Sequence, residues 1–509
     1  MLAVARAVGL VGIEAFPVDV EVDMSRGLPS FIMVGLPDNS VRESRERVQA
    51  AIVNSGYVIP PKKLTVNLAP AGRKKEGPAF DLPIAVGLLA AGGFIPASRV
   101  EKFAFAGELA LDGRIRPVRG MLPMASGLPP GLEGVFVPAE NAQEAAISSP
   151  APVIPAGSLQ EVANWLQGAE GLFPEPSSLP VPEAPVYSVD FAEVHGQHQP
   201  RRALEIAAAG GHNMLMIGPP GAGKTMLAQR LPSILPPLSR IEAIETTKIH
   251  SVAGLLPEGV ALVRERPFRA PHHTVSTPGL IGGGTHPRPG EVSLAHNGVL
   301  FLDELPEFNR NALEAMRQPM ESCRVTVSRA VTSTDFPARF MLVAAMNPCP
   351  CGYLTHPGKA CNCGASQVQR YLGKISGPLL DRIDIHLEVA PLSRGQLGPD
   401  AEPGEPSAPI RARVATARSI QEERYRNLKD VFCNACMPPS LLRKHCAVDS
   451  SGRKLLDAAA ARFGFSARAY YRALRVSRTI ADLSGEDRVS SAHVAEAVQF
   501  RALERDYWV

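Results

Sequence analysis

The sequence predicts a multidomain α/β protein built around a nucleotide-binding core, and three observations support this fold class. A phosphate-loop motif lies between an apolar strand pattern and the start of a helix pattern. A stretch rich in Pro, Glu and Ser at residues 171–187 separates this core from an α+β region that precedes it. After Pro438, apolar residues recur at helical spacing, which predicts a C-terminal bundle of helices.

Composition narrows the class of protein. The 509 residues are enough for about three domains, and a net charge of +3 does not by itself argue for a nucleic-acid partner. No apolar run reaches the length of a membrane span, and residues 1–16 lack the basic start and cleavage site of a signal peptide. Eight cysteines in so long a chain favour thiols or a metal site over disulfides. We therefore expect a cytoplasmic protein with no membrane partner.

The region before the phosphate loop, residues 1–168, carries a mixed pattern. Residues 18–23 alternate between valine and acidic side chains and predict a half-buried strand, and residues 64–68 predict another. Residues 40–43 match a capping box and predict that a helix begins there. Residues 82–89 are almost wholly apolar and predict a buried helix. Together these elements predict an α+β domain.

The phosphate-loop motif reads GPPGAGKT and matches G-x-x-x-x-G-K-[ST] at every position. Its glycines let backbone N–H groups turn toward a phosphate, Lys224 supplies positive charge, and the Thr225 hydroxyl can hold Mg²⁺. The motif therefore predicts ATP and Mg²⁺ as cofactors. The predicted nucleotide-binding residues of the loop are Gly218, Pro219, Pro220, Gly221, Ala222, Gly223, Lys224 and Thr225.

Acidic side chains follow a second apolar strand pattern at residues 299–302. Asp303 is predicted to bind Mg²⁺ as part of the nucleotide site, and Glu304 to polarise the water that attacks the γ-phosphate. A third strand pattern, residues 340–346, ends in Asn347, whose amide can orient that water. The two acids are predicted to lie at the C-terminal edge of a central parallel strand.

Two arginines complete the predicted catalytic set. Arg382 in the segment GPLLDRID is interpreted as an arginine finger that reaches the nucleotide of a neighbouring subunit. Arg468 opens a later helix and resembles the sensor-2 arginine of related ATPases. For either arginine alone, a surface ion pair is the alternative interpretation.

The ordered set of motifs, with LAHNGVLFLDELPEF at its centre, resembles the magnesium-chelatase-like branch of AAA+ ATPases. Ahead of it, the segments KEGPAFD and GELALDGRIRPVRGML resemble the protease domain of Lon, which has a ribosomal S5 domain 2-like fold. Ala79 and Leu122 stand where that family has its Ser–Lys dyad. The resemblance therefore implies a Lon-like fold without peptidase activity, because neither side chain is a nucleophile or a base.

The combination of these domains, together with the segment RAPHH at residues 269–273, resembles the ComM/YifB family. Its members are bacterial proteins linked to natural transformation and DNA branch migration. The resemblance implies a homo-hexamer that acts on branched or single-stranded DNA, alongside recombination proteins. The domain limits predicted on this basis are 1–168 for the Lon-like domain, 169–189 for a Pro-rich linker, 190–395 for the AAA+ core, 396–410 for a flexible insert and 411–509 for the helical lid.

Two further groups of residues are candidates for binding. A C-x-C…C-x-C pattern places four thiols in one loop and suits tetrahedral Zn²⁺, although the C-x-C spacing is tighter than the usual C-x₂-C. Four reduced thiols without an ion are the alternative. The four cysteines are Cys349, Cys351, Cys361 and Cys363. Arg269 and Arg329 lie in two insertions that form pore hairpins in chelatase-like ATPases, where they are predicted to contact DNA; solvated surface arginines are the alternative.

Three functions remain open on the sequence. The first is an ATP-driven hexameric motor that promotes branch migration with helicase activity. The second is a protein-remodelling ATPase whose inactive Lon-like domain binds protein clients. The third is a metal-chelatase subunit, which is the weakest because chelatase motor subunits lack the Lon-like domain.

Overall fold

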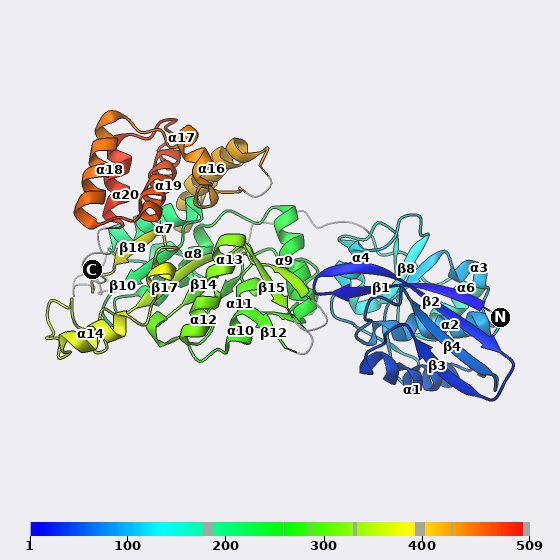
Figure 1. The fold of residues 1–509 in the computed structure, drawn as a ribbon. Coiled ribbons are helices and arrows are strands. Elements are labelled where there is room, and N and C mark those ends of the chain that lie inside the picture. Colours follow the sequence, from blue (N-terminus) through cyan, green and yellow to red (C-terminus); the bar gives the residue numbers. More distant parts are fainter. Residues whose placement is uncertain are drawn as a thin grey trace. The chain divides into compact units, whose positions relative to one another are not determined.

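The computed structural model describes residues 2–176, 187–257, 259–284, 287–328, 333–391, 403–428 and 431–501 (Figure 1). The chain divides into two compact units. The first comprises Met1–Glu183 together with Arg240–Val263, and the second comprises Ala184–Ser239 together with Arg264–Val509. Within the described ranges, no helix combines the length and the apolar character needed to cross a membrane.

A seven-stranded mixed sheet organises the first unit, with strand order β3-β4-β2-β1-β5-β8-β9. The β1–β2 and β2–β4 pairs are antiparallel, whereas the other neighbouring strands run parallel. The strands are β1 (Leu2–Val11), β2 (Glu14–Ser25), β3 (Ser30–Val34), β4 (Lys63–Ala69), β5 (Phe103–Phe105), β8 (Gly134–Pro138) and β9 (Val153–Ala156). A small hairpin of β6 (Glu108–Leu109) and β7 (Ile115–Arg116) lies outside this sheet. The strands predicted at residues 18–23 and 64–68 are confirmed as parts of β2 and β4.

Helices cover this sheet, and the buried one predicted at residues 82–89 is confirmed as α2 (Asp81–Ala91). Every residue of α2 is buried, and the helix packs on β1 and β2. The predicted capping box is wrong, because the N-cap of α1 (Asn39–Asn54) is Asp38, two residues before Ser40. The extended Asp38 accepts the N–H of Val41 at 2.8 Å, so Ser40 lies inside the first turn. The other helices of this region are α3 (Ala97–Val100), α4 (Met121–Ser126), α5 (Ala142–Ala146) and α6 (Leu159–Gln167).

The first unit also contains α9 (Arg240–Ala253), a helix that the chain supplies after the phosphate loop. Its partner is α4, and the link between them is a buried carboxylate, Glu144. Glu144 accepts hydrogen bonds from the Ser251 hydroxyl and from the backbone N–H of Leu122, the latter at 3.0 Å. The predicted domain limits place α9 in the ATPase core, whereas its contacts group it with the N-terminal region.

A five-stranded parallel sheet forms the centre of the second unit, with strand order β11-β14-β17-β10-β18. The strands are β10 (Met214–Ile217), β11 (Phe268–Arg269), β14 (Val299–Leu302), β17 (Met341–Met346) and β18 (Ile385–Glu388). The three strands predicted from apolar runs are thereby confirmed, with β17 one residue shorter than expected. Because all five strands run parallel, the residues that follow β10, β14 and β17 meet at one edge.

Shorter elements complete the core of this unit. Two hairpins are inserted between strands of the sheet, β12 (Gly282–Gly283) with β13 (Arg288–Pro289) and β15 (Arg324–Ser328) with β16 (Ser333–Pro337). The helices are α7 (His198–Gly210), α8 (Lys224–Ile234), α10 (Thr277–Ile281), α11 (Glu291–Leu294), α12 (Arg310–Ala315), α13 (Arg317–Ser322), α14 (Ala365–Leu372) and α15 (Gly377–Leu380).

The predicted C-terminal bundle is present, and Figure 1 shows α18, α19 and α20 packed side by side. Its helices are α16 (Ser407–Tyr425), α17 (Pro439–His445), α18 (Ser450–Phe463), α19 (Ala467–Leu483) and α20 (Ser491–Gln499). The flexible insert predicted at 396–410 is wrong in its last part, since residues 407–410 form the first turn of α16. A proline is tolerated there because the first turn needs no N–H donor. Residues 177–186 of the predicted linker, 392–395 at the end of the predicted AAA+ core and 396–402 of the predicted insert lie outside the described ranges.

We expect the Glu144→Ala substitution to loosen α9. It leaves the Leu122 N–H, the Ser251 hydroxyl and the Asn141 amide without their acceptor, at a cost of about 1–3 kcal/mol for each donor that stays buried. Hydrogen exchange should accelerate in α4 and α9. Glu133→Ala is the control, because it removes only an exposed ion pair with Lys102. Equal protection of α9 in the wild type and both variants would contradict this role of Glu144.

Candidate active site

The phosphate loop follows β10 directly and ends where α8 begins. Gly221 and Gly223 have φ of +78° and +86°, a backbone region that residues with a side chain rarely adopt. At Gly218, a Cβ would lie 2.3 Å from the carbonyl oxygen of Val389, so the loop needs glycine there for a close approach to the neighbouring strand. The lead-in segment supports the loop as well, because Gln197 donates to the Ala222 carbonyl at 2.7 Å.

Lys224 lies at the base of this loop with 8% of its surface exposed. Its ammonium group donates to the carbonyl oxygens of Gly218 at 2.6 Å and Pro219 at 3.0 Å, and to the Asn347 side chain at 3.2 Å. Burial lowers the pKa of Lys224, while the carboxylates of Asp303 and Glu304 act against that shift. The strand-end amide and the loop lysine therefore share one hydrogen bond.

A candidate Mg²⁺ position lies between α8 and β14. The Thr225 hydroxyl donates to Asp303 at 2.7 Å, so two oxygen ligands of the kind that Mg²⁺ prefers lie side by side. Asp303 also accepts the backbone N–H of Glu304 at 2.9 Å, which fixes the orientation of its carboxylate. The chemistry of this oxygen pair fits Mg²⁺ bound together with a nucleotide phosphate.

Glu304 projects from a sharp turn, with φ of +53°. More than half of its side chain is exposed, and one carboxylate oxygen lies 3.3 Å from Nδ1 of His273. The His273 ring in turn packs on His272, with ring centroids 4.0 Å apart. No sequence motif predicts this partner of Glu304. RAPHH begins at Arg269, the last residue of β11, and β11 pairs with β14, the strand that precedes the acidic residues. No local sequence pattern contains this pairing.

Of the two predicted catalytic arginines, one is buried and the other is exposed. Arg382 is nearly buried, and its guanidinium pairs with Glu321 at 2.5 Å and donates to the Pro378 carbonyl at 2.6 Å. A role at a neighbouring subunit stays a prediction, and it requires Arg382 to leave Glu321. Arg468 is exposed in the first turn of α19, and its role also stays a prediction.

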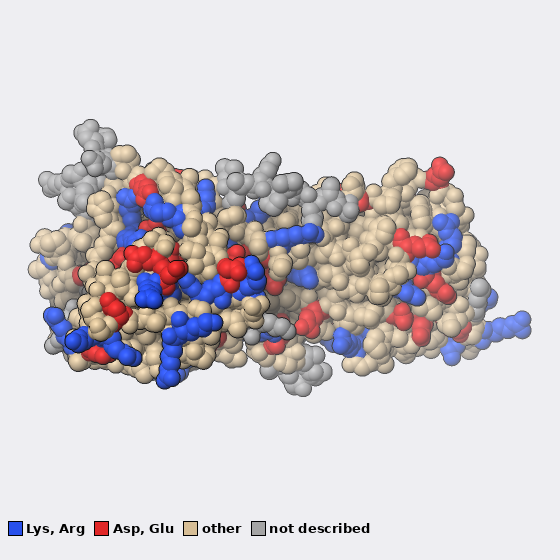
Figure 2. Space-filling view, turned by 90° about the horizontal axis from the view of Figure 1, so that it is seen from above, with Lys and Arg blue, Asp and Glu red and all other residues tan. Residues whose placement is uncertain are grey.

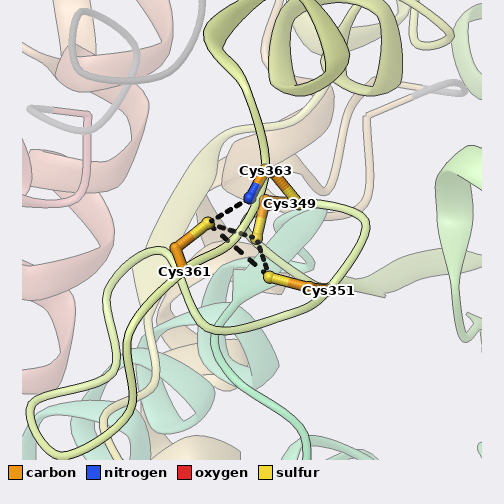
Figure 3. A group of neighbouring side chains, drawn as sticks. All are labelled: Cys349, Cys351, Cys361 and Cys363. Carbon is orange, nitrogen blue, oxygen red and sulfur yellow. Dashed lines mark hydrogen bonds between the residues drawn. The ribbon is translucent and has the colours of Figure 1, made fainter.

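The predicted DNA-contacting residues and the cysteines can also be located. The predicted hairpin position of Arg269 is wrong, because Arg269 is the last residue of the core strand β11. It forms a two-point ion pair with Glu291, at 2.7 and 2.8 Å, so its charge is already compensated. Arg329 lies outside the described residues. The four loop cysteines do converge, and their sulfur atoms all lie within 4.8 Å of one another (Figure 3).

Comparison with known protein families assigns all three parts of the chain. A family model described as "Magnesium chelatase, subunit ChlI" matches residues 190–397. Its C-terminal companion matches residues 404–501, and a model described as "Subunit ChlI of Mg-chelatase" matches residues 20–141.

Relatives resemble the chain over its whole length. Competence protein ComM of Haemophilus influenzae is 44% identical over 99% of this chain and 98% of its own. The chain belongs to the ComM/YifB family of magnesium-chelatase-like AAA+ proteins. YifB of Escherichia coli is also 44% identical over the same shares. The magnesium-chelatase 38 kDa subunit of Rhodobacter capsulatus is 25% identical over 34% of this chain and 54% of its own. Membership of the ComM/YifB family implies the use of ATP and Mg²⁺, as the phosphate loop predicts.

Glu304→Gln should separate nucleotide binding from hydrolysis. The amide keeps the size of the side chain but cannot accept a proton from water, so turnover should fall by about 10²–10⁴. Nucleotide affinity should stay near that of the wild type, because Lys224 and the Thr225–Asp303 pair are untouched. Lys224→Ala should instead weaken binding by about 10- to 100-fold, the loss expected for a charged hydrogen bond. Titration with a fluorescent nucleotide measures the affinity, and phosphate release measures the turnover. Normal turnover in Glu304→Gln would remove this residue from the hydrolysis machinery.

His273→Phe tests the newly found partner of Glu304. Phenylalanine keeps the ring that packs on His272 and on Phe308, but it removes the nitrogen that faces the carboxylate. Because Glu304 loses a fixed orientation, we expect turnover to fall roughly tenfold without a change in nucleotide affinity. His272→Phe is the matched control, since the nitrogen of His272 contacts Thr274 and not Glu304. Equal loss in both variants would indicate a loop-folding role instead.

Proposed function

We propose that this protein is the subunit of a cytoplasmic, homo-hexameric motor that hydrolyses ATP to move DNA and promotes branch migration during recombination in natural transformation. The observation that carries the proposal is the placement of two β-hairpins around the hydrolysis strand. One hairpin precedes β14 in the chain and the other follows it, and β14 ends in Asp303 and Glu304. The full-length similarity to a competence protein supports the same process.

ATP hydrolysis in this proposal rests on residues of one sheet edge. Lys224 exchanges its bonds to loop carbonyls for bonds to phosphate oxygens, and Asn347 holds the attacking water. Glu304 accepts the proton of that water. A bound Mg²⁺ would neutralise phosphate charge beside Thr225 and Asp303. Zn²⁺ at the cysteine cluster completes the proposed cofactors.

The two hairpins pack against each other, which supports a joint response to the nucleotide. A Cβ at Gly282 in the first hairpin would lie 3.4 Å from Val327 in the second. In β15 the valines point inward, whereas Arg324 is exposed, and Arg288 is exposed on β13. Exposed arginines can pair with DNA phosphates, and phosphate contacts do not depend on base sequence. Such contacts suit a motor that must move along DNA of any sequence.

The mixed surface charge indicates that the proposed DNA contact involves a few arginines and not a broad basic face. On the face shown in Figure 2, basic and acidic side chains are interspersed, in keeping with the net charge of +3. Arg269 is held by Glu291, so a contact between Arg269 and DNA requires that pair to open. We therefore assign the first contacts to Arg288 and Arg324, together with the predicted Arg329.

A protein-remodelling ATPase is the second candidate, and one observation favours it. The edge strand β3 and the turn beside it expose apolar side chains, with Leu28 88% exposed and Leu36 55% exposed. An exposed apolar edge suits docking of a protein client. Ala79 and Leu122, at the positions of the Lon dyad, are both buried, so this docking carries no predicted peptidase chemistry. ATPase stimulation by branched DNA, but not by unfolded protein, separates the two candidates.

The double variant Arg288→Glu/Arg324→Glu tests the motor. Charge reversal on both hairpins adds repulsion where phosphates are attracted, so DNA-stimulated ATPase and strand movement should fall sharply while basal ATPase persists. The slope of log binding constant against log salt should become shallower by about 0.9 for each lost phosphate contact.

Lys454→Glu is the control for this double variant, because it reverses an exposed charge on α18 of the helical bundle. Wild-type movement of branched DNA by the double variant would contradict the hairpin assignment and favour the protein-remodelling candidate.

A further inference from the structure

We propose that Cys349, Cys351, Cys361 and Cys363 bind one Zn²⁺ ion, and that the loop held by this ion supports the phosphate loop through the contact of Gly352 with Pro220. The second half of this inference rests on the nucleotide site proposed above. The first half, a four-thiolate zinc centre, stands on the cysteines alone.

The separations among the sulfur atoms of Cys349, Cys351 and Cys361 fit one face of a single tetrahedral site, and the sulfur of Cys363 lies within 4.8 Å of each of them. Zn–S bonds of about 2.3 Å place two sulfurs of a regular tetrahedron about 3.8 Å apart. The sulfur of Cys349 lies 3.4 Å from that of Cys351 and 3.7 Å from that of Cys361, and the Cys351–Cys361 separation is 3.6 Å. The narrow spacing of the C-x-C pairs therefore does not prevent convergence.

The donor set selects the class of metal. Four sulfur ligands without carboxylate or imidazole favour Zn²⁺ over the oxygen-seeking Mg²⁺ and Ca²⁺. An iron–sulfur cluster would place several iron and sulfide ions between the cysteines, and sulfurs 3.4–3.7 Å apart leave no room for them. A disulfide is not formed either, because bonded sulfurs lie about 2.05 Å apart.

An ion at this position would close a loop that has little regular structure. Residues 347–364 connect the end of β17 to the start of α14 without a helix or strand of their own. One cysteine pair lies at the start of this loop and the other at its end, as Figure 3 shows. Binding one ion to both pairs fixes the two ends together, which is the usual role of a four-cysteine zinc site.

The closed loop contacts the nucleotide site at two points. Asn347, which accepts a hydrogen bond from Lys224, lies two residues before the first cysteine. Gly352, with φ of +84°, packs on the phosphate loop so closely that a Cβ there would lie 2.6 Å from Cδ of Pro220. Any movement of the cysteine loop therefore changes the surface against which Pro220 rests.

Metal content tests the first half of the proposal. The full-length protein, purified under reducing conditions, should contain about one zinc per chain by elemental analysis. After exchange, Co²⁺ should give the intense visible absorption of tetrahedral thiolate ligation. Cys361→Ser/Cys363→Ser should lose the zinc, and Cys436→Ser, outside the cluster, should keep it. A wild-type chain that neither contains zinc nor takes up stoichiometric Zn²⁺ or Co²⁺ would overturn the site.

Nucleotide affinity tests the second half without altering a cysteine. Gly352→Ala forces a Cβ against Pro220, so it should keep its zinc yet bind fluorescent ADP about tenfold more weakly, a change of ~1.4 kcal/mol. Gly358→Ala is the matched control, because a Cβ there meets nothing closer than 3.6 Å. If both Gly352→Ala and the zinc-free double variant bind ADP with wild-type affinity, the cysteine loop does not support the phosphate loop, and the second half of the proposal is overturned.

These readouts are independent of the motor. Zinc content and ADP affinity require neither DNA nor strand movement, so a failure of the DNA proposal would leave both results unchanged. Conversely, a protein that moves DNA but lacks zinc would overturn this inference alone.

Discussion

The hydrogen bonds of the Lys224 ammonium group hold together the candidate active site of the second unit. This ammonium group lies nearly buried, and burial alone disfavours its charge, so it is stabilised by carbonyl oxygens of its own loop and by Asn347. This arrangement gathers the phosphate loop and the end of β17 around one positive charge. In the proposed mechanism, a phosphate that replaces the carbonyls changes the bond to Asn347 as well, which couples nucleotide binding to the neighbouring strand.

The strand order explains why these groups meet. β17 lies between β14 and β10, so the carboxyl ends of the three strands bring together Asp303, Asn347 and the phosphate loop. Each strand is buried on both faces, which requires the continuous apolar runs found in the sequence. The apolar runs form the buried strands, and the charged residues that follow these runs therefore lie at the edge where the carboxyl ends of the strands meet. The two hairpins belong to the segments that connect β11 to β14 and β14 to β17, and both segments begin and end at this sheet.

Features that arise from local sequence patterns could be predicted, whereas contacts between residues far apart in the chain could not. The phosphate loop, β14 with its two acids, and β17 with Asn347 follow from apolar periodicity and local motifs, and the structure contains each strand. The contact of His273 with Glu304 depends on the pairing of β11 with β14, which no local pattern contains. The grouping of α9 with the N-terminal region has the same origin, since Glu144 and Ser251 are far apart in the chain. Asp38 was missed for a different reason, because the neighbouring Ser40–Glu43 pair matched a capping box better.

A buried ion network extends the coupling to the C-terminal helices. Asp384 is 1% exposed, and although burial alone would raise the pKa of Asp384, the charge of Arg472 and the hydrogen bond with His212 lower that pKa below its ordinary range. Arg472 belongs to α19, and the same carboxylate accepts the backbone N–H of Asn213 at 3.2 Å. The side chain of Asn213 then donates to the carbonyl of Arg382 at 3.2 Å. A shift of α19 away from the sheet would leave Asp384 buried without its main partner, which is costly. The helical bundle, the segment that carries Arg382 and the base of β10 are therefore constrained to move together.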